Sequence, residues 1–147
     1  MKKLLVGILL ISSTSAFATH AYRSEDCTSE VISLEYLGNY PFGGAYRVKG
    51  VKGAEEAFEA FPDYYIPDFR NSVEEADIVY EEKSSSMISM KAPTHDGCFQ
   101  HTENETIDVI VIKSISDKAQ EELGLSVNQK IELKCINTLD IPVGPEC

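Results

Sequence analysis

The sequence predicts an all-β domain with two short helices, folded as a small barrel or sandwich and stapled by disulfides. Three observations predict this class. Short segments rich in β-branched and aromatic residues recur along the chain, separated by glycine, proline and asparagine. Only two short segments have helical periodicity. Four cysteines follow a leader-like N-terminus, which indicates an oxidising compartment where thiols pair: Cys27, Cys98, Cys135 and Cys147.

The first 18 residues have the pattern of a bacterial secretory signal peptide. A basic start precedes an apolar run over 4–11 and an Ala-Phe-Ala cleavage site at 16–18. We therefore expect cleavage after Ala18, a flexible tail over 19–26 and a single β-rich domain over 27–147, in the periplasm or secreted. No second long apolar run follows, so we expect no membrane anchor.

Several segments are predicted to be strands. The segments 30–37 and 45–51 flank the turn sequence Gly-Asn-Tyr-Pro-Phe-Gly-Gly, so we expect them to form a hairpin. The segment 106–114 is almost continuously apolar, and 130–136 alternates strictly, with Cys135 on the core-facing side. Two shorter strands and two loops complete this part of the prediction: strands at 77–82 and 86–91, and loops at 62–76 and 92–105.

Two short helices are predicted. The apolar residues of 54–61 recur at i, i+3, i+4 and i+7, the spacing of an amphipathic helix, and Pro62 ends it. Ser116 is an N-cap for a helix over 117–123, which Gly124 ends. A helix closing one end of several strands resembles the architecture of an oligonucleotide/oligosaccharide-binding (OB-like) barrel. The resemblance concerns architecture only.

The disulfide connectivity is open at this point. Four cysteines allow three connectivities, and the sequence does not choose among them. We favour Cys98–Cys135 and Cys27–Cys147, because the second bond ties the start of the folded part to the end of the chain. We expect these cysteines to be structural, since two such bonds rival the stability of a whole small domain.

The charge of the chain is strongly negative and uneven. The net charge is -11, and the segment 55–82 holds ten acidic residues and a single basic one, Arg70. Because affinity for phosphate backbones comes from lysine and arginine, this composition argues against nucleic-acid binding. It favours a basic protein or peptide as the partner. The predicted partner-binding residues are the aromatic anchors Tyr64, Tyr65 and Phe69, with Asp63, Asp68, Glu74 and Glu75 steering the encounter.

Metal binding is the second functional hypothesis. His95, Cys98 and His101 lie in one glycine-containing segment, and imidazole and thiolate are good zinc or copper ligands. His20, near the expected mature N-terminus, is a further candidate ligand. This site requires a reduced Cys98. The competing interpretation is a Cys98 disulfide flanked by two exposed histidines.

A small envelope hydrolase is the third hypothesis. The sequence has no Gly-x-Ser-x-Gly, no phosphate-cradling loop, no His-Glu-x-x-His and no Cys-x-x-Cys. Paired carboxylates are so abundant that no pair stands out as catalytic. We therefore expect a non-enzymatic binding domain without a cofactor.

Overall fold

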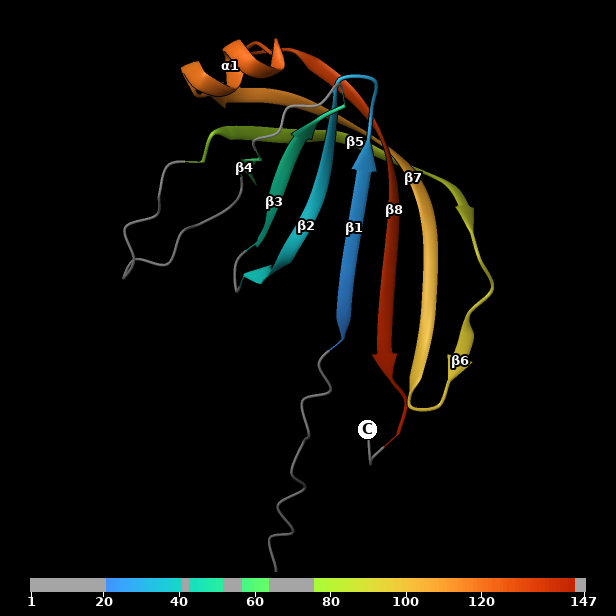
Figure 1. Ribbon diagram of the computed structural model, residues 1–147. Coiled ribbons are helices and arrows are strands. Elements are labelled where there is room, and N and C mark those ends of the chain that lie inside the picture. Colours follow the sequence, from blue (N-terminus) through green and yellow to red (C-terminus); the bar gives the residue numbers. More distant parts are fainter. Residues whose placement is uncertain (1–20, 41–42, 52–56, 64–75, 145–147) are drawn as a thin grey trace, which may run out of the picture.

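The computed structural model describes residues 21–40, 43–51, 57–63 and 76–144. The described chain is mostly β, which confirms the predicted all-β class, and it includes one helix (Figure 1). The elements in chain order are β1 (Tyr22–Thr28), β2 (Ile32–Tyr40), β3 (Gly43–Gly50), β4 (Phe58–Pro62), β5 (Ile78–Met90), β6 (Thr94–Asp96), β7 (Phe99–Ile115), α1 (Asp117–Leu123) and β8 (Lys130–Pro142).

The strands form a sheet that closes on itself near α1. Their order is β5-β4-β3-β2-β1-β8-β7-β6, and β5 also pairs with β7, which completes the ring. The β4–β5 pairing is parallel and short, joining 60–62 to 78–80, whereas β5 follows β7 along its whole length. The start of β5 lies beside α1, since Ser116 donates its backbone N–H to the carbonyl of Asp77. The ring is therefore closed at the α1 end, and it is not a complete barrel.

The apolar core fills the closed end of the ring. Inward-facing residues alternate along the strands, as in Ile131, Leu133 and Cys135 of β8 and Ile110 and Ile112 of β7. The other fully buried side chains pack against them from neighbouring elements: Ile32, Val48, Phe58, Ala60, Ala119 and Leu125. This packing positions the strands whose opposite ends carry the polar inner face described below.

The predictions for α1 and the β2–β3 hairpin are confirmed. The Ser116 hydroxyl accepts a hydrogen bond from the N–H of Ala119 at 3.2 Å, as an N-cap should. Gly124 ends the helix in the left-handed region, with φ of 67°, where glycine has no steric penalty. Strands β2 and β3 pair antiparallel from Ile32 opposite Gly50 onward.

The helix predicted over 54–61 is wrong. Residues 58–62 form strand β4, in which Phe58, Ala60 and Pro62 are buried and Glu59 is exposed. The apolar residues of this short segment fit both a period of 3.6 and a period of 2, so pairing with β3 and β5 decides the structure. Tertiary pairing therefore overrides the local helical pattern.

Three further boundaries differ from the prediction. The expected strands at 77–82 and 86–91 are one long strand, β5, and the expected loop at 92–105 contains β6 and the first part of β7. Residues 22–26 of the expected flexible tail belong to β1 and pair with β8. The expected signal peptide and most of the predicted loop at 62–76 lie outside the described residues.

The predicted disulfide pairing is wrong. Cys27 bonds to Cys135, because the register of β1 and β8 places these two residues directly opposite each other. Cys98 is also disulfide-bonded. Cys147 lies outside the described residues. Cys135 faces the core, as predicted from the alternation of 130–136.

Candidate functional site

A polar layer separates the apolar core from the open half of the ring. Glu25 of β1 is 8 % exposed and accepts two hydrogen bonds, from the Tyr46 hydroxyl at 2.9 Å and from Arg23 Nη2 at 2.7 Å. The Arg23 guanidinium also lies 5.7 Å from the centre of the Tyr36 ring. Tyr46 packs edge-to-face against Tyr36 and against Tyr80. These contacts fix the positions of Glu25 and Arg23 beside the open half of the ring.

Carboxyl groups accumulate on the inner face beside this layer. Asp108 of β7 is 7 % exposed, and its Oδ1 accepts a hydrogen bond from the Ser85 hydroxyl. Partial burial raises the pKa of Glu82, and the carboxylates of Asp108 and Glu25 raise it further, although Arg23 lowers it. In the described part of the chain, three acidic groups thus share this region with one guanidinium.

A cleft of about 630 Å³ lies on the inner face beyond the polar layer. Its lining comes from β1, β5, β7 and β8: Arg23, Met90, Thr102, Glu103, Asn104, Asn137, Thr138 and Leu139. The Asn104 Oδ1 atom is buried and has no hydrogen-bond partner among the described residues. Asn137 Nδ2, in contrast, donates to Thr106 Oγ1 at 3.4 Å. The cleft lining combines the apolar side chains of Met90 and Leu139 with polar residues, among them Asn104 with its buried, unpaired acceptor.

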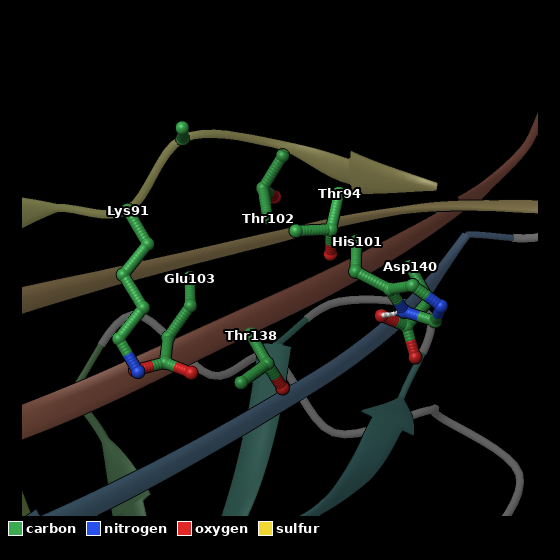
Figure 2. Close-up of a pocket in the computed structure, with 8 residues that line it drawn as sticks. Lys91, Thr94, His101, Thr102, Glu103, Thr138 and Asp140 are labelled. Carbon is green, nitrogen blue, oxygen red and sulfur yellow. Dashed lines mark hydrogen bonds and ion pairs between the residues drawn. The ribbon is translucent and has the colours of Figure 1, made fainter. Parts of the chain in front are cut away.

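A second pocket, of about 340 Å³, adjoins this cleft (Figure 2). The two cavities share Thr102, Glu103 and Thr138. Thr102 and Glu103 lie on β7 between the residues that pair with β5 and those that pair with β6. Figure 2 shows a nitrogen–carboxylate contact at each end of this pocket, an ion pair at one end and a hydrogen bond at the other. They are Lys91 Nζ with Glu103 Oε1 at 2.6 Å, and His101 Nδ1 with Asp140 Oδ1 at 2.7 Å. The Lys91 ammonium group and the His101 imidazole of this pocket therefore each have a carboxylate partner within the protein.

The predicted metal ligands are not brought together. His95 lies opposite Gln100 and His101 lies opposite Thr94, so the two histidines project from opposite faces of the β6–β7 hairpin. Cys98 is disulfide-bonded and offers no thiolate. His20 lies outside the described residues.

One other group of metal-ligating residue types lies close together on the inner face. Glu25, Cys27, Asp108 and Cys135 have ligand atoms within 4.8 Å of one another. However, Cys27 and Cys135 are bonded to each other, so two carboxylates are the donors that this group has to offer. Structural zinc sites are almost always four-coordinate, and two carboxylates do not make such a set.

Of the predicted partner-binding residues, the structure describes only Asp63. It lies in an exposed turn after β4, and its N–H donates to the carbonyl of Tyr80 at 2.7 Å. The remaining members lie outside the described residues: Tyr64, Tyr65, Asp68, Phe69, Glu74 and Glu75.

Two other acids of the 55–82 segment have structural contacts. Asp77 accepts a hydrogen bond from the Ser116 hydroxyl at 3.0 Å, beside the start of α1. Glu81 forms ion pairs with Lys83 and Lys113. Part of the acidity that the sequence suggested for a partner is therefore used within the fold.

The inner-face residues Arg23, Glu25 and Asp108 were missed by sequence reasoning. Asp108 carried a signal, because an acid within the otherwise apolar run 106–114 is expected to have a buried partner. The signal for Arg23 and Glu25 was weaker: in a strand that includes Cys27, residues 23, 25 and 27 lie on the same face. Placing 19–26 in a tail concealed it.

No protein-family model, curated protein or solved structure matches this chain. In the described part of the chain, no helix is long and apolar enough to cross a membrane.

Proposed function

We propose that this protein is a non-enzymatic binding protein of the periplasm or cell exterior, and that it holds a basic segment of a partner protein on the inner face of its open half. One observation carries the proposal. Glu25, Glu82 and Asp108 face this region, and Arg23 is the one cation that accompanies them in the described part of the chain. A lysine or arginine side chain of the partner compensates this excess of negative charge.

The cleft suits the two ends of such a side chain. Met90 and Leu139 offer apolar contact to the aliphatic stem of a lysine or arginine. The buried Oδ1 atom of Asn104 is an acceptor for an ammonium or guanidinium hydrogen. A cationic side chain in the cleft therefore meets the unpaired acceptor, and Glu25, Glu82 and Asp108, which do not line the cleft themselves, attract it from the neighbouring inner face.

The contact region predicted from the sequence extends this proposal. Residues 63–75 connect β4 to β5, and β5 carries Glu82 and Met90. Tyr64, Tyr65 and Phe69 remain our predicted aromatic anchors for the same basic partner, with Asp63, Asp68, Glu74 and Glu75 as steering charges.

Residence in an oxidising compartment is supported by two independent features. The leader pattern over 1–18 is typical of exported proteins. Structural disulfides such as Cys27–Cys135 persist where thiols are not kept reduced. Sequencing the N-terminus of the protein from the envelope fraction tests this part of the proposal, and we expect it to start at Thr19.

Fluorescence anisotropy tests the binding function. The probes are a labelled ten-residue peptide of alternating lysine and valine and the matching peptide of alternating glutamate and valine. We expect the lysine peptide to bind, and we expect its affinity to fall as the salt concentration rises from 20 to 200 mM, because salt screens surface charges. Equal binding of both peptides, or no binding of the lysine peptide at low salt, would contradict the proposal.

Two variants locate the binding on the protein. Glu82→Gln removes one negative charge from the inner face. We expect this variant to bind the lysine peptide roughly fivefold more weakly, as for the loss of a single partly exposed charge contact. Glu121→Gln makes the same change in net charge on the exposed surface of α1 and should leave the affinity within roughly twofold of the original, since the charge lies far from the cleft. Equal effects of the two variants would show that only net charge matters.

A further inference from the structure

The second half of β5 has no strand neighbour on one edge among the described residues, and we call this edge the free edge. Strand β4 pairs with β5 only at Ile78, Val79 and Tyr80, whereas β7 pairs with β5 as far as Met90. From Glu81 to Met90, the described residues therefore supply a strand neighbour on one edge only. An antiparallel strand alternates its backbone hydrogen-bonding groups between its two edges, so this stretch presents donors and acceptors to an incoming strand.

The C-terminal part of this edge, over 84–90, carries little of the usual protection against pairing among the described residues, although bulges interrupt its pairing with β7 at Glu82/Ser84 and Met87/Ser89. Every residue from 82 to 90 is exposed, including the apolar side chains of Met87, Ile88 and Met90. The last seven residues, Ser-Ser-Ser-Met-Ile-Ser-Met, contain no charge and no proline. Native edge strands are commonly blunted by charges, prolines or a covering element. An exposed edge segment that has no charge over 84–90 and displays three apolar side chains therefore indicates an interaction surface.

We infer that this free edge of β5, over residues 81–90, receives an extended basic segment of the partner as an added strand. This inference rests on the proposed function and specifies how the partner is held. Backbone hydrogen bonds to an edge provide affinity in this mode, and the neighbouring side chains provide specificity.

Charge decides between a basic segment and a second copy of the chain. Glu82 stands at the start of the free edge, near Glu25 and Asp108 of the inner face. Pairing with a second copy brings together two molecules that each carry a net charge of -11, and they repel. A positively charged segment is attracted to the same edge, so the partner's segment is the favoured occupant.

The inner-facing residues of β5 define the sequence that fits. Side chains of an added strand alternate between the two faces of the sheet. On the inner face, lysine or arginine side chains lie near Glu82, and their aliphatic stems cover Met87 and Met90, which oppose Thr106 and Asn104 of β7. The apolar residues of the added strand then lie on its other face. The expected ligand is therefore an extended segment in which basic and apolar residues alternate.

N-methylated versions of the lysine–valine peptide test strand addition. One version carries N-methyl groups on all lysine amides and the other on all valine amides, so each blocks one edge of the extended peptide. We expect at least one version to bind about tenfold more weakly than the parent peptide, because several backbone hydrogen bonds are lost. Parent-like affinity of both versions would overturn the inference.

Paired surface variants test the location. Ile88→Lys places a positive charge, of the same sign as the peptide's lysines, on the free edge. We expect this variant to bind the lysine peptide about tenfold more weakly, or weaker still. Val127→Lys is the control, since Val127 is 50 % exposed and Ile88 is 52 % exposed, and Val127 lies in the connection between α1 and β8. Equal effects of the two variants would place the peptide elsewhere.

The outcomes separate this inference from the proposed function. If the parent lysine peptide fails to bind, the proposed function fails. If it binds but resists both N-methylation and Ile88→Lys, the function stands and strand addition is wrong. A wild-type dimer in analytical ultracentrifugation that Ile88→Lys dissociates would identify a second copy as the occupant and would also overturn the inference.

Discussion

Cys27 and Cys135 lie directly opposite each other on the neighbouring strands β1 and β8, and their sulfur atoms are bonded across a sequence separation of 108 residues. The bond joins the first described strand to the last one. It lies at the boundary between the apolar core and the polar layer, since Glu25 precedes Cys27 by two residues on the same face of β1. The bond therefore fixes the register that brings Arg23 of β1 beside Leu139 of β8 in the cleft.

The double variant Cys27→Ala/Cys135→Ala should lower the free energy of unfolding by about 2–5 kcal/mol, because the unfolded chain regains the freedom of a long loop. Urea denaturation followed by far-UV circular dichroism measures this change. Disulfide mapping of the wild-type protein is the companion experiment and should recover a linked peptide pair containing Cys27 and Cys135. Recovery of Cys135 linked to Cys98 would contradict the structure.

The polar layer should contribute measurably to stability. Tyr46→Phe removes the hydroxyl that donates to Glu25, so we expect the free energy of unfolding to fall by about 0.5–1.5 kcal/mol. Tyr22→Phe is the control, because Tyr22 lies on the outer face, is well exposed and keeps its ring contact with Phe99. We expect the control to change stability by less than about 0.5 kcal/mol. Indistinguishable variants would argue against a buried hydrogen bond at Glu25.

Two adjacent glutamates should respond to pH in opposite directions. Partial burial, Asp108 and Glu25 hold the pKa of Glu82 above its ordinary value of 4.5, so the native state binds more protons and stability falls as pH rises from 4.5 through the folded pKa. Hydrogen bonds from Lys83 and Lys113 hold the pKa of Glu81 below 4.5, so its contribution is present above pH 4.5 and is lost as pH falls through the folded pKa.

Variants of these two residues should therefore differ in sign. At pH 7, Glu82→Gln should be more stable than the wild type, by less than about 1 kcal/mol because solvent screens an exposed carboxyl. Glu81→Gln should be less stable than the wild type at the same pH. Both differences should shrink as pH is lowered toward about 3.5, where the wild-type carboxyls take up protons. Thermal unfolding from pH 3.5 to 8 measures this, and differences of equal sign at pH 7 would refute the assignment.

The stability costs of alanine substitutions at Phe58 and Phe61 distinguish strand β4 from the helix that the sequence predicted. Phe58 is buried and Phe61 is only partly buried, so Phe58→Ala should cost about 3–5 kcal/mol and Phe61→Ala clearly less. An amphipathic helix over 54–61 would bury both side chains on one face and make the two costs similar. Urea denaturation of both variants distinguishes the two structures.

The sequence predicted the C-terminal third of the fold best. Here the signals are strong and local: Ser116 and Gly124 mark both ends of α1, and the residues of 130–136 alternate without exception. The first part of β7, from Phe99 to Glu105, was missed because its side chains are mostly polar, so the strand is recognisable only from its pairing with β6 and β8.

The candidate site was less accessible to sequence reasoning. The disulfide connectivity depends on a strand register between residues 108 positions apart, and local patterns do not encode such a register. Glu25 and Asp108 become a site only when β1 and β7 face the same interior. The acidic character of the chain was evident, but the inner-face carboxyls that underlie the proposal lie partly outside the segment in which acids are densest.

A nuclear magnetic resonance titration of the uniformly ¹⁵N-labelled protein with the unmodified lysine–valine peptide tests the central claim most directly. We predict that the largest shift changes fall on the inner face and free edge, at Arg23, Glu82, Ser85 to Met90 and Asn104. Shift changes confined to other acidic surfaces, such as Glu121 and Glu122 of α1, would contradict it.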